Sequence, residues 1–559
     1  MTSVVRLGVY RDAPAPGVDL GRWSGSDWQL WLVVMASGLV LRLVFYTGYF
    51  GSDEVTYTLA AFNLLHDNWA VAAYVGSNRY GINLPVAGFA ALFGQNEFAA
   101  ALYSLVCSLA EVSLIFHFGR QMLGRRAGFS AAAVLAFMPI HVHSAGRLMA
   151  DAPLALAITA SFLFFWAGEA RNRSVAFAWA GLAAGLAFWV KPHAMLYLGV
   201  FLTYPILFRR WNWKWAWMLA AFAAVVLANN CLFWALTGNP FFLLEAIHAR
   251  QTSGYLESGT ASGSITDHPL YYLVYFFGRI YHTWLAAYLA VVAVALWLKV
   301  GGRGTVSRAL EIRYLVWWAF GLVLLFSLFL VSWRPLLFIP KQTNYMLMFA
   351  APLSLLAGHA LAQLSGARFW AATALMLVPS AVLAGMQQNS VRVFTANSNA
   401  ALDFARSHAE SEVFVNTNAF RAATFNNLVR PNAPIINIRF IGDLKSAQSD
   451  HGPGRTRTQR YAIIDTETLS WGTDEPITSI AAVPACWARV GALRPSGTGS
   501  GTSMLQAFRP VAAMLPSGLR DMATRKLEDL TRPAPAYVFE VPATECAPLD
   551  LPGSSAPAK

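Results

Sequence analysis

The chain has 559 residues, of which 56% are hydrophobic and only 13% charged, and its formal net charge is +12. A soluble globular protein carries about 25% charged residues, so this composition excludes an ordinary soluble fold for the whole chain. The excess of positive charge does not indicate nucleic-acid binding, because the basic residues lie mostly in short loops between apolar runs and no nucleic-acid-binding motif accompanies them.

The N-terminal 27 residues are polar, and the first apolar run after them is long enough to cross a bilayer. We therefore interpret residues 1–27 as a cytoplasmic tail rather than a cleaved signal peptide. The apolar runs that follow predict a polytopic all-α membrane domain over residues 28–387, with about eleven spans of roughly 20 residues each. The predicted spans are 28–48, 97–118, 127–145, 152–169, 175–190, 193–208, 215–236, 271–298, 314–332, 340–362 and 369–387.

The basic residues between these spans predict the orientation of the chain. They concentrate in alternate loops, which places those loops and the N-terminus in the cytoplasm under the positive-inside rule. An odd number of spans then puts residues 388–559 on the outside, in the periplasm of a bacterial inner membrane. The basic residues of the inside loops are Arg120, Arg125 and Arg126, then Arg171 and Arg173, then Arg209, Arg210 and Lys214, then Lys299, Arg303, Arg308 and Arg313, and finally Arg368.

The first outside segment, residues 49–96, begins with two adjacent acids, Asp53 and Glu54. Apolar residues recur at helical spacing after them, so we expect an amphipathic helix over about 54–65 that lies in the membrane interface. Ser52 or Asp53 could cap this helix, which is the simplest role for Asp53. Acids beside a lipid headgroup site could equally act as a general base and its neighbour.

The second candidate segment, 141–153, joins two spans on the outside. Arg147 and Asp151 are one helical turn apart and could form an ion pair, or Arg147 could bind phosphate while Asp151 orients it. His141 and His143 are candidate metal ligands, although residues two apart do not share a helix face. A metal site there is the weaker interpretation.

Further cations fall near the outer ends of the spans, where a cationic cavity would suit an anionic lipid headgroup. For Lys191, which precedes a helix-breaking proline, the alternative is a snorkelling side chain. The outside segment 237–270 is rich in Gly and Ser, and we expect a mobile loop there. The cationic set consists of Arg42, Lys191, Arg279 and Lys341, with Tyr345 one turn from Lys341.

Residues 388–559 have the pattern of a small soluble α/β domain. Short strands are predicted at 412–417, 435–438, 461–465 and 536–541, and a helix at 419–429. Cys107 and Cys231 fall in apolar spans and are expected to be small buried side chains. Cys486 and Cys546 could form a disulfide in an oxidising compartment, with a free pair equally open.

Five motifs in this order resemble the glycosyltransferase C superfamily, in particular the branch of protein O-mannosyltransferases and lipid A aminoarabinose transferases, similar to glycosyltransferase family 39. The first combines Arg42 with Asp53 and Glu54. The others are RYGINLPVAGFAALFGQNEFAA at 79–100, GRLMADAP at 146–153, GLAFWVKP at 185–192 and PKQTNYMLMFAAP at 340–352. The resemblance covers residues 28–386.

The resemblance implies an inverting glycosyltransferase whose donor is a sugar on a polyprenyl phosphate, acting at the periplasmic face on a lipid, envelope-glycan or protein acceptor. It assigns Asp53, with Glu54 beside it, to the catalytic acid of the first loop and Asp151 to that of the second. The lysine expected in the first loop is absent, since Asn83 stands near that position, and Arg79 is the candidate substitute. The family implies no certain cofactor, and a divalent metal remains possible. The residues assigned to donor phosphate are Arg42, Arg79, Arg147, Lys191, Arg279, Lys341 and Tyr345.

Two other functions use similar features. A flippase or transporter of an anionic polyprenyl lipid would also place cations near its spans, but such proteins often contain internal repeats with matching broken helices, and no second copy of the Asp53-Glu54 or Lys191-Pro192 pattern occurs. A membrane-anchored envelope-assembly protein would need no charges at the span ends.

Overall fold

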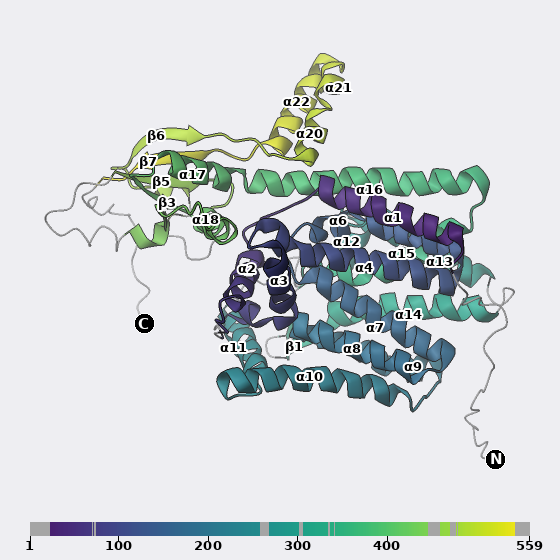
Figure 1. The fold of residues 1–559 in the computed structure, drawn as a ribbon. Coiled ribbons are helices and arrows are strands. Elements are labelled where there is room, and N and C mark those ends of the chain that lie inside the picture. Colours follow the sequence, from purple (N-terminus) through teal and green to yellow (C-terminus); the bar gives the residue numbers. More distant parts are fainter. Residues whose placement is uncertain are drawn as a thin grey trace, which may run out of the picture.

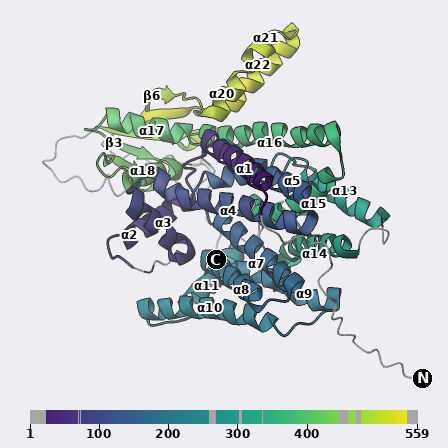
Figure 2. The same ribbon diagram turned by 45° about the vertical axis from the view of Figure 1, so that its right-hand side comes forward.

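The computed structural model describes residues 23–69, 71, 74–257, 268–300, 306–333, 336–339, 341–444, 459–469, 477 and 479–542. Figure 1 shows a bundle of helices that run alongside one another and, at one end of it, a smaller α/β domain made from the C-terminal residues. The turned view in Figure 2 shows the same two parts. Helix α16 (Gly366–Phe394) runs along the bundle and leads into the C-terminal domain.

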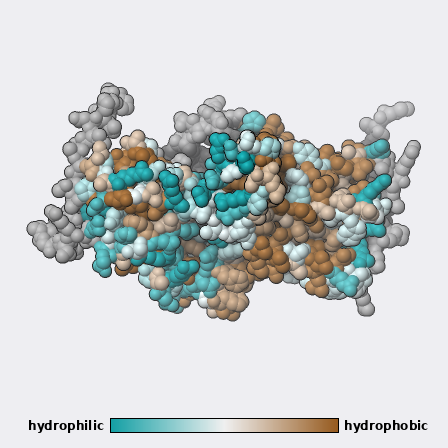
Figure 3. All heavy atoms as spheres, turned by 90° about the horizontal axis from the view of Figure 1, so that it is seen from above, coloured by the Kyte–Doolittle hydropathy of each residue, from teal (hydrophilic) through white to brown (hydrophobic). Residues whose placement is uncertain are grey.

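The bundle is the membrane domain of a multi-pass protein. Among the described residues, seven helices are long and apolar enough to cross a membrane, and an eighth span results if a helix pair bent by 59° counts as one. The seven are α1 (Gly25–Val44), α4 (Glu97–Leu123), α7 (Asp151–Arg171), α10 (Trp215–Thr237), α14 (Val306–Leu328), α15 (Leu347–Ala362) with the turn before it, and α16; the bent pair is α5 (Arg125–Phe137) and α6 (Pro139–Ala145). Hydrophobic side chains gather over this half of the molecule in Figure 3, and hydrophilic ones over the C-terminal domain.

Shorter apolar helices complete the bundle: α3 (Tyr80–Phe93), α8 (Ser174–Val190), α9 (Leu198–Phe208) and α13 (Ala286–Val300). The predicted broken pair around Lys191-Pro192 is confirmed, because α8 ends before Lys191 and the 3-10 helix η2 (Pro192–Tyr197) leads into α9. Proline lacks an N–H and cannot continue α8, which ends the helix at that point.

Three expectations about the outer segments are wrong. The span predicted over 271–298 is two helices, α12 (Tyr271–Phe277) and α13, separated by a stretch in which Trp284 has a left-handed backbone (φ 50°). Residues 242–257 of the segment expected to be a mobile loop form helix α11 (Phe242–Glu257), and residues 258–267 of it lie outside the described residues. Helix α14 ends at Leu328, before a hairpin of β1 (Leu330–Trp333) and β2 (Leu336–Phe338). Local hydropathy does not distinguish a continuous apolar helix from one interrupted by a turn.

Glycines let the helices of the bundle approach closely. A Cβ on Gly181 of α8 would lie 2.0 Å from the carbonyl oxygen of Met218 in α10, and one on Gly358 of α15 would lie 2.5 Å from the backbone nitrogen of Ala131 in α5. Lipid chains are as apolar as leucine, so helices in a bilayer associate through close packing rather than hydrophobicity. These contacts therefore hold the scaffold on which the outer segments rest.

The segment after α1 contains helix α2 (Asp53–Leu64), the 3-10 turn η1 (Val75–Asn78) and α3. Helix α2 confirms the helix predicted over about 54–65. Helix α11 contacts η1 and α10, and Leu243 of α11 is buried in a cluster with Val75, Tyr80 and Phe233. The first outside segment is thus part of a packed structure at the end of the bundle that carries the C-terminal domain.

The C-terminal domain is built on a five-stranded mixed sheet with strand order β4-β3-β5-β7-β6. Strands β4, β3 and β5 are parallel, and β7 is antiparallel to both β5 and β6. Three predicted strands and the predicted helix are confirmed, the strand predicted at 435–438 instead begins at Ile438, and β6 was not predicted. The elements are α17 (Ala396–Ser407), β3 (Glu412–Val415), α18 (Thr417–Val429), β4 (Ile438–Phe440), β5 (Arg460–Asp465), β6 (Ala488–Leu493), α20 (Ser500–Gln506), α21 (Arg509–Ala513), α22 (Ser517–Thr531) and β7 (Ala536–Glu540).

The cysteine predictions have mixed outcomes. Cys107 is buried, as expected, but Cys231 is exposed on the surface of α10. Cys486 is disulfide-bonded. The other half of the predicted pair, Cys546, lies outside the described residues.

The C-terminal domain holds the loop between α1 and α2. Tyr49 donates a hydrogen bond to the carbonyl oxygen of Asn418 (3.1 Å), and Arg421 donates one to the carbonyl oxygen of Gly51 (3.1 Å). Gly51 has φ +102°, and a Cβ there would lie 2.0 Å from Oδ1 of Asn418. Only glycine fits this left-handed position against α18. The backbone immediately before Asp53 is therefore fixed from the domain side.

Gly181→Ala should destabilise the bundle by about 1–3 kcal/mol, because a methyl group would force the backbones of α8 and α10 apart. Gly88→Ala is the matched control: Gly88 also lies inside a helix, and no heavy atom lies within 4 Å of its Cβ position. Thermal unfolding in detergent should give a lower Tm for the first variant and an unchanged or higher Tm for the second. Equal shifts would show that the close contact does not matter.

Candidate active site

Glu54, rather than Asp53, satisfies the backbone at the start of α2. Its carboxylate is buried and accepts hydrogen bonds from the backbone N–H groups of Phe50 (2.5 Å), Gly51 (2.9 Å) and Ser52 (3.2 Å). Ser52 occupies the N-cap position without a side-chain capping bond. The expectation that Ser52 or Asp53 caps the helix is therefore wrong, and Asp53 is left available for another role.

The carboxylate of Asp53 is held by three side chains. Tyr74 donates a hydrogen bond to Oδ1 (2.7 Å), Tyr57 donates one to Oδ2 (3.2 Å), and Nη1 of Arg79 lies 4.0 Å from Oδ2. Arg79 also donates to the hydroxyl of Tyr57. The Asp53 side chain keeps 33% of its surface exposed, against 11% for Arg79. The carboxylate is thus oriented by donors on one side and open on another.

Burial keeps the two donors in their donating forms. Desolvation raises the pKa of Tyr57 well above its usual value, so its hydroxyl remains protonated. Burial alone would lower the pKa of Arg79, but the neighbouring Tyr57 and Asp53 raise it above the usual value. Both groups therefore keep the hydrogens that they present toward Asp53.

A second charged cluster forms between the ends of α7 and α8. Asp151 is the first residue of α7, and its Oδ1 lies 3.5 Å from Nζ of Lys191, just past the end of α8. Asn344 donates a hydrogen bond to Oδ2 of Asp151 (3.0 Å), and Nζ of Lys191 lies 4.3 Å from the ring centroid of Tyr345. Asp151, Lys191 and Tyr345 are all buried. Three predicted site residues are thus brought into contact.

The two clusters lie close enough to interact electrostatically. Desolvation is the main cause of the raised pKa of Tyr57, and the charge of Asp151 adds to it. The site therefore has one open carboxylate, Asp53, beside Arg79, and a buried ammonium, Lys191, beside Tyr345. This arrangement can bind an anionic group and place a proton acceptor beside it.

The spacing of Arg147 and Asp151 suggested an ion pair between them, but the structure pairs Arg147 with Glu54 instead. Its Nη2 lies 3.8 Å from Oε2 of Glu54, and its guanidinium stacks on the ring of Phe50 at 4.4 Å. Nη1 also hydrogen-bonds with Nε2 of His143 (3.3 Å). Arg147 lies in the turn before α7 and not on a shared helix face with Asp151, which explains the difference. It supports the loop that carries Asp53 through Glu54.

Arg42 lies inside the bundle rather than beside Asp53. Its guanidinium donates to the carbonyl oxygens of Gly38 (2.8 Å) and Ala136 (3.0 Å) and to Oγ of Ser108 (2.9 Å), and it hydrogen-bonds with Nδ1 of His141 (2.7 Å). These bonds use four of the five donor hydrogens of the side chain. The structure therefore does not bring Arg42 to the two clusters.

The same network extends to a buried acid. Nε2 of His141 lies 3.0 Å from Oε2 of Glu111, and Thr159 donates a hydrogen bond to Oε1 of Glu111 (2.7 Å). His141 and His143 thus face different partners, so the metal pair considered for them is not formed. Among the residues that the structure describes, no three His, Cys, Asp or Glu side chains gather as a metal site.

The two remaining predicted cations, Lys341 and Arg279, contact groups outside the two clusters. Lys341 is fully buried, donates to the carbonyl oxygen of Ile339 (3.2 Å) and lies 5.2 Å from the ring of Phe338. Arg279 is exposed after α12 and donates to the hydroxyl of Tyr275 (2.9 Å). Neither has a direct contact with Asp53 among these bonds. Asn83, which stands near the position of the expected first-loop lysine, donates to the carbonyl oxygen of Ser77 (2.7 Å). The cation beside Asp53 in this loop is Arg79.

Sequence reasoning missed Tyr74 and Asn344 as site residues. Tyr74 lies in an irregular segment 21 residues after Asp53, where no periodicity or motif marks it. Asn344 stands inside the quoted motif at 340–352, next to Tyr345. Its place in that motif, between the predicted site residues Lys341 and Tyr345, could have marked it as a candidate.

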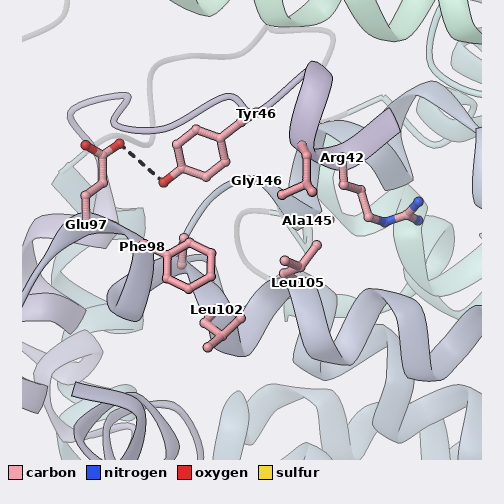
Figure 4. A pocket seen from close by; sticks show the side chains of 10 residues that line it. Arg42, Tyr46, Glu97, Phe98, Leu102, Leu105, Ala145 and Gly146 are labelled. Atoms are coloured by element: carbon pink, nitrogen blue, oxygen red, sulfur yellow. Dashed lines mark hydrogen bonds between the residues drawn. The ribbon is translucent and has the colours of Figure 1, made fainter. Parts of the chain in front are cut away.

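A separate cavity of about 380 Å³ lies between α1 and α4. Figure 4 shows that apolar side chains of Phe98, Leu102 and Leu105 line it, that Tyr46 donates to Glu97 (3.2 Å), and that the guanidinium of Arg42 points away. Glu97 also borders a second, more polar cavity of about 280 Å³ beneath the C-terminal domain. Asp53 lines neither cavity.

The sequence comparisons concern the N-terminal half of the bundle. Residues 82–234 match the family described as dolichyl-phosphate-mannose-protein mannosyltransferase. The chain is 27% identical over 213 residues to the undecaprenyl phosphate-alpha-4-amino-4-deoxy-L-arabinose arabinosyl transferase of Pseudomonas aeruginosa, and 26% identical over 211 residues to that of Pseudomonas paraeruginosa. Each alignment covers 36% of this chain and 36% of the length of the relative.

The structural similarity extends over most of the molecule. ArnT from Cupriavidus metallidurans bound to undecaprenyl phosphate superimposes with a TM-score of 0.54 at 15% identity, covering 84% of this chain and 97% of that chain. AglB from Archaeoglobus fulgidus, in complex with an inhibitory peptide and a dolichol-phosphate, gives 0.50 at 10% identity and covers 92% and 89%. The chain has the glycosyltransferase C fold. The predicted resemblance to the aminoarabinose-transferase-like branch is confirmed.

Arg42→Met should lower the free energy of unfolding by about 3–5 kcal/mol, because it leaves the carboxylate of Glu111 buried without its compensating charge. The double variant Arg42→Met/Glu111→Gln should recover much of that loss, since neither charge then remains. Thermal unfolding of the purified chain measures both. If the double variant is as unstable as the sum of the two single variants, the two side chains are not coupled.

Proposed function

We propose that the chain is an inverting glycosyltransferase that moves a sugar from a polyprenyl-phosphate carrier to a lipid, glycan or protein acceptor. The observation that carries the proposal is the oriented, partly exposed Asp53 carboxylate, together with the buried Asp151–Lys191 pair of the second cluster. The glycosyltransferase C fold and the relatives that use undecaprenyl-phosphate-linked aminoarabinose, as their names state, support it. A proton acceptor beside an anion site is what this reaction requires.

In the proposed mechanism, the phosphate of the donor meets Lys191 and Arg79. An acceptor oxygen attacks the anomeric carbon as the bond from that carbon to the phosphate oxygen breaks. The acceptor proton passes to Asp53, and the bonding electrons leave with the polyprenyl phosphate, whose charge the two cations stabilise. A single displacement from the opposite face inverts the anomeric centre.

Each neighbour has a part in this scheme. Tyr57 and Tyr74 hold the Asp53 carboxylate in one orientation, and Asn344 holds Asp151. Asp151 holds the buried Lys191 ammonium in place through their ion pair. Glu54 and Arg147 fix the backbone from which Asp53 projects. Positioning of this kind accounts for a large share of enzymatic rate enhancement.

The reaction is proposed to take place at the periplasmic face of the inner membrane. The two clusters lie at the end of the bundle that carries the C-terminal domain, while the basic loops, including Arg120, Arg171 and Lys214, belong to its other end. Under the positive-inside rule that other end is cytoplasmic. The C-terminal domain is then periplasmic, where lipid-linked sugars and envelope acceptors meet.

Asp53→Asn should lower kcat by about 10²- to 10⁴-fold, because the amide cannot accept the acceptor proton. Binding of the donor should change little, since Lys191 and Arg79 remain. Release of polyprenyl phosphate from a labelled polyprenyl-phosphate sugar measures both. Asp67→Asn is the control, because Asp67 is exposed at the end of α2 with a left-handed backbone (φ 55°) that asparagine also adopts. Transfer by Asp53→Asn at the wild-type rate would rule out the proton acceptor.

Lys191→Met should weaken donor binding by about 10- to 100-fold, the size of one lost charge-assisted hydrogen bond. Lys191→Arg keeps the charge and should restore part of the binding. Lys214→Met removes a lysine at the other end of the bundle and should have no effect. The readout is the dissociation constant of polyprenyl phosphate, with thermal unfolding measured alongside. Unchanged binding in a stably folded Lys191→Met variant would contradict the phosphate contact.

A further inference from the structure

The connection between strands β6 and β7 is far longer than the sheet requires. The two strands are antiparallel neighbours, which two to five residues can join. Instead, residues 494–535 leave the sheet, return along α16 and form a helical hairpin of α20, α21 and α22. Figures 1 and 2 both show this hairpin pointing away from the bundle, across the direction of α16.

The base of the hairpin is fixed to one level of α16. Gln388 accepts a hydrogen bond from the backbone N–H of Gly501 (2.6 Å), and Asn389 bonds with Thr502 (2.8 Å) and with the carbonyl oxygen of Leu530 (2.6 Å). Both side chains are buried. The helices also approach closely, since a Cβ on Gly501 would lie 2.1 Å from the carbonyl oxygen of Gly385. The hairpin therefore has a defined height along the bundle.

That height coincides with the membrane surface on the side of the C-terminal domain. The apolar part of α16 ends at Met386, roughly 20 residues or 30 Å from its start, and polar residues follow from Gln387. Helix α1 ends at the same level, because Phe45, just after it, packs in a buried cluster with Ala384 and the partly buried Met504 of α20. Two independent spans thus leave the hydrocarbon core where the hairpin begins.

The hairpin exposes apolar and basic side chains that the bundle does not cover. The exposed apolar residues lie on α21, on α22 and beside the ends of α21, and the most exposed, Met514, keeps 84% of its surface. Residues 500–531 carry four basic and three acidic side chains, and two of the acids, Glu528 and Asp529, lie at the base of the hairpin beside Leu530. The apolar residues are Phe508, Val511, Met514, Leu515, Leu519 and Met522, and the basic ones are Arg509, Arg520, Arg525 and Lys526.

We propose that this hairpin lies in the surface of the bilayer that the chain itself spans, with its apolar side chains at the boundary of headgroups and acyl chains and its basic side chains on anionic headgroups. Exposed apolar residues beside basic ones are the composition of segments that bind membrane surfaces. In water the same surface would be an exposed apolar patch of the kind that marks an interaction site. The hairpin sets the height of the C-terminal domain over the membrane, independently of the reaction catalysed.

A spin label at position 514 tests the proposal in the full chain. Met514→Cys is made with Cys107 and Cys231 replaced by alanine, labelled, and reconstituted into vesicles of phosphatidylcholine with phosphatidylglycerol. The label should collide with oxygen severalfold more often than with a water-soluble nickel chelate, as a membrane-embedded label does. Ile436→Cys, an exposed position beside β4 at the far edge of the sheet, is the aqueous control.

Charge reversal supplies the second measurement. Arg520→Glu with Lys526→Glu should make the label at 514 shallower and remove its dependence on phosphatidylglycerol, without changing thermal unfolding. The proposal is overturned if the label at 514 is as accessible to nickel as the label at 436. It is also overturned if labels at 514 broaden one another as protein density rises, because a second copy would then cover the hairpin.

Discussion

The candidate site depends on the carboxylate of Glu54. By accepting three backbone N–H groups from residues 50–52, it folds the loop after α1 into the start of α2 and leaves the neighbouring Asp53 unbound to the backbone. A buried carboxylate needs compensation, and Arg147 supplies it from the turn before α7. Glu54 thus fixes the backbone of the loop, and Asp53 remains free to bind Tyr57 and Tyr74. The covering domain holds the same loop through Asn418 and Arg421.

This division of labour follows from helix geometry. Adjacent residues on an α-helix point about 100° apart, so Asp53 and Glu54 cannot share one set of partners. Glu54 turns back toward the preceding backbone, while Asp53 turns toward Tyr57, one turn ahead, and toward Tyr74 and Arg79. The charged residues of the first outside segment and those at the ends of α7 and α8 therefore meet at one place, although they are far apart in the sequence.

Much of this arrangement could be predicted from the sequence. Hydropathy located most spans, and helical periodicity located α2. Short runs of apolar and β-branched residues located β3, β5 and β7 of the C-terminal sheet, because those strands are buried in the domain core. The broken helix at Lys191 was predicted because proline acts locally.

Partner identity could not be predicted in the same way. Arg42, Arg147 and Lys191 all stand near the outer ends of spans, yet one compensates Glu111 inside the bundle, one supports Glu54 and one pairs with Asp151. These choices depend on which helices become neighbours, and residue spacing within one segment does not contain that information. Tyr74 was missed for the same reason, and the break between α12 and α13 was missed because average hydropathy does not register a single left-handed residue such as Trp284.

The most direct test of the account is the position of the phosphate group in an electron cryomicroscopy structure of this chain with undecaprenyl phosphate bound. The account predicts that the phosphate oxygens lie within hydrogen-bonding distance of Lys191 and Arg79, on the open side of the Asp53 carboxylate. A phosphate bound instead at the cavity beside Glu97, with Lys191 still paired only to Asp151, would contradict the assignment of the donor site.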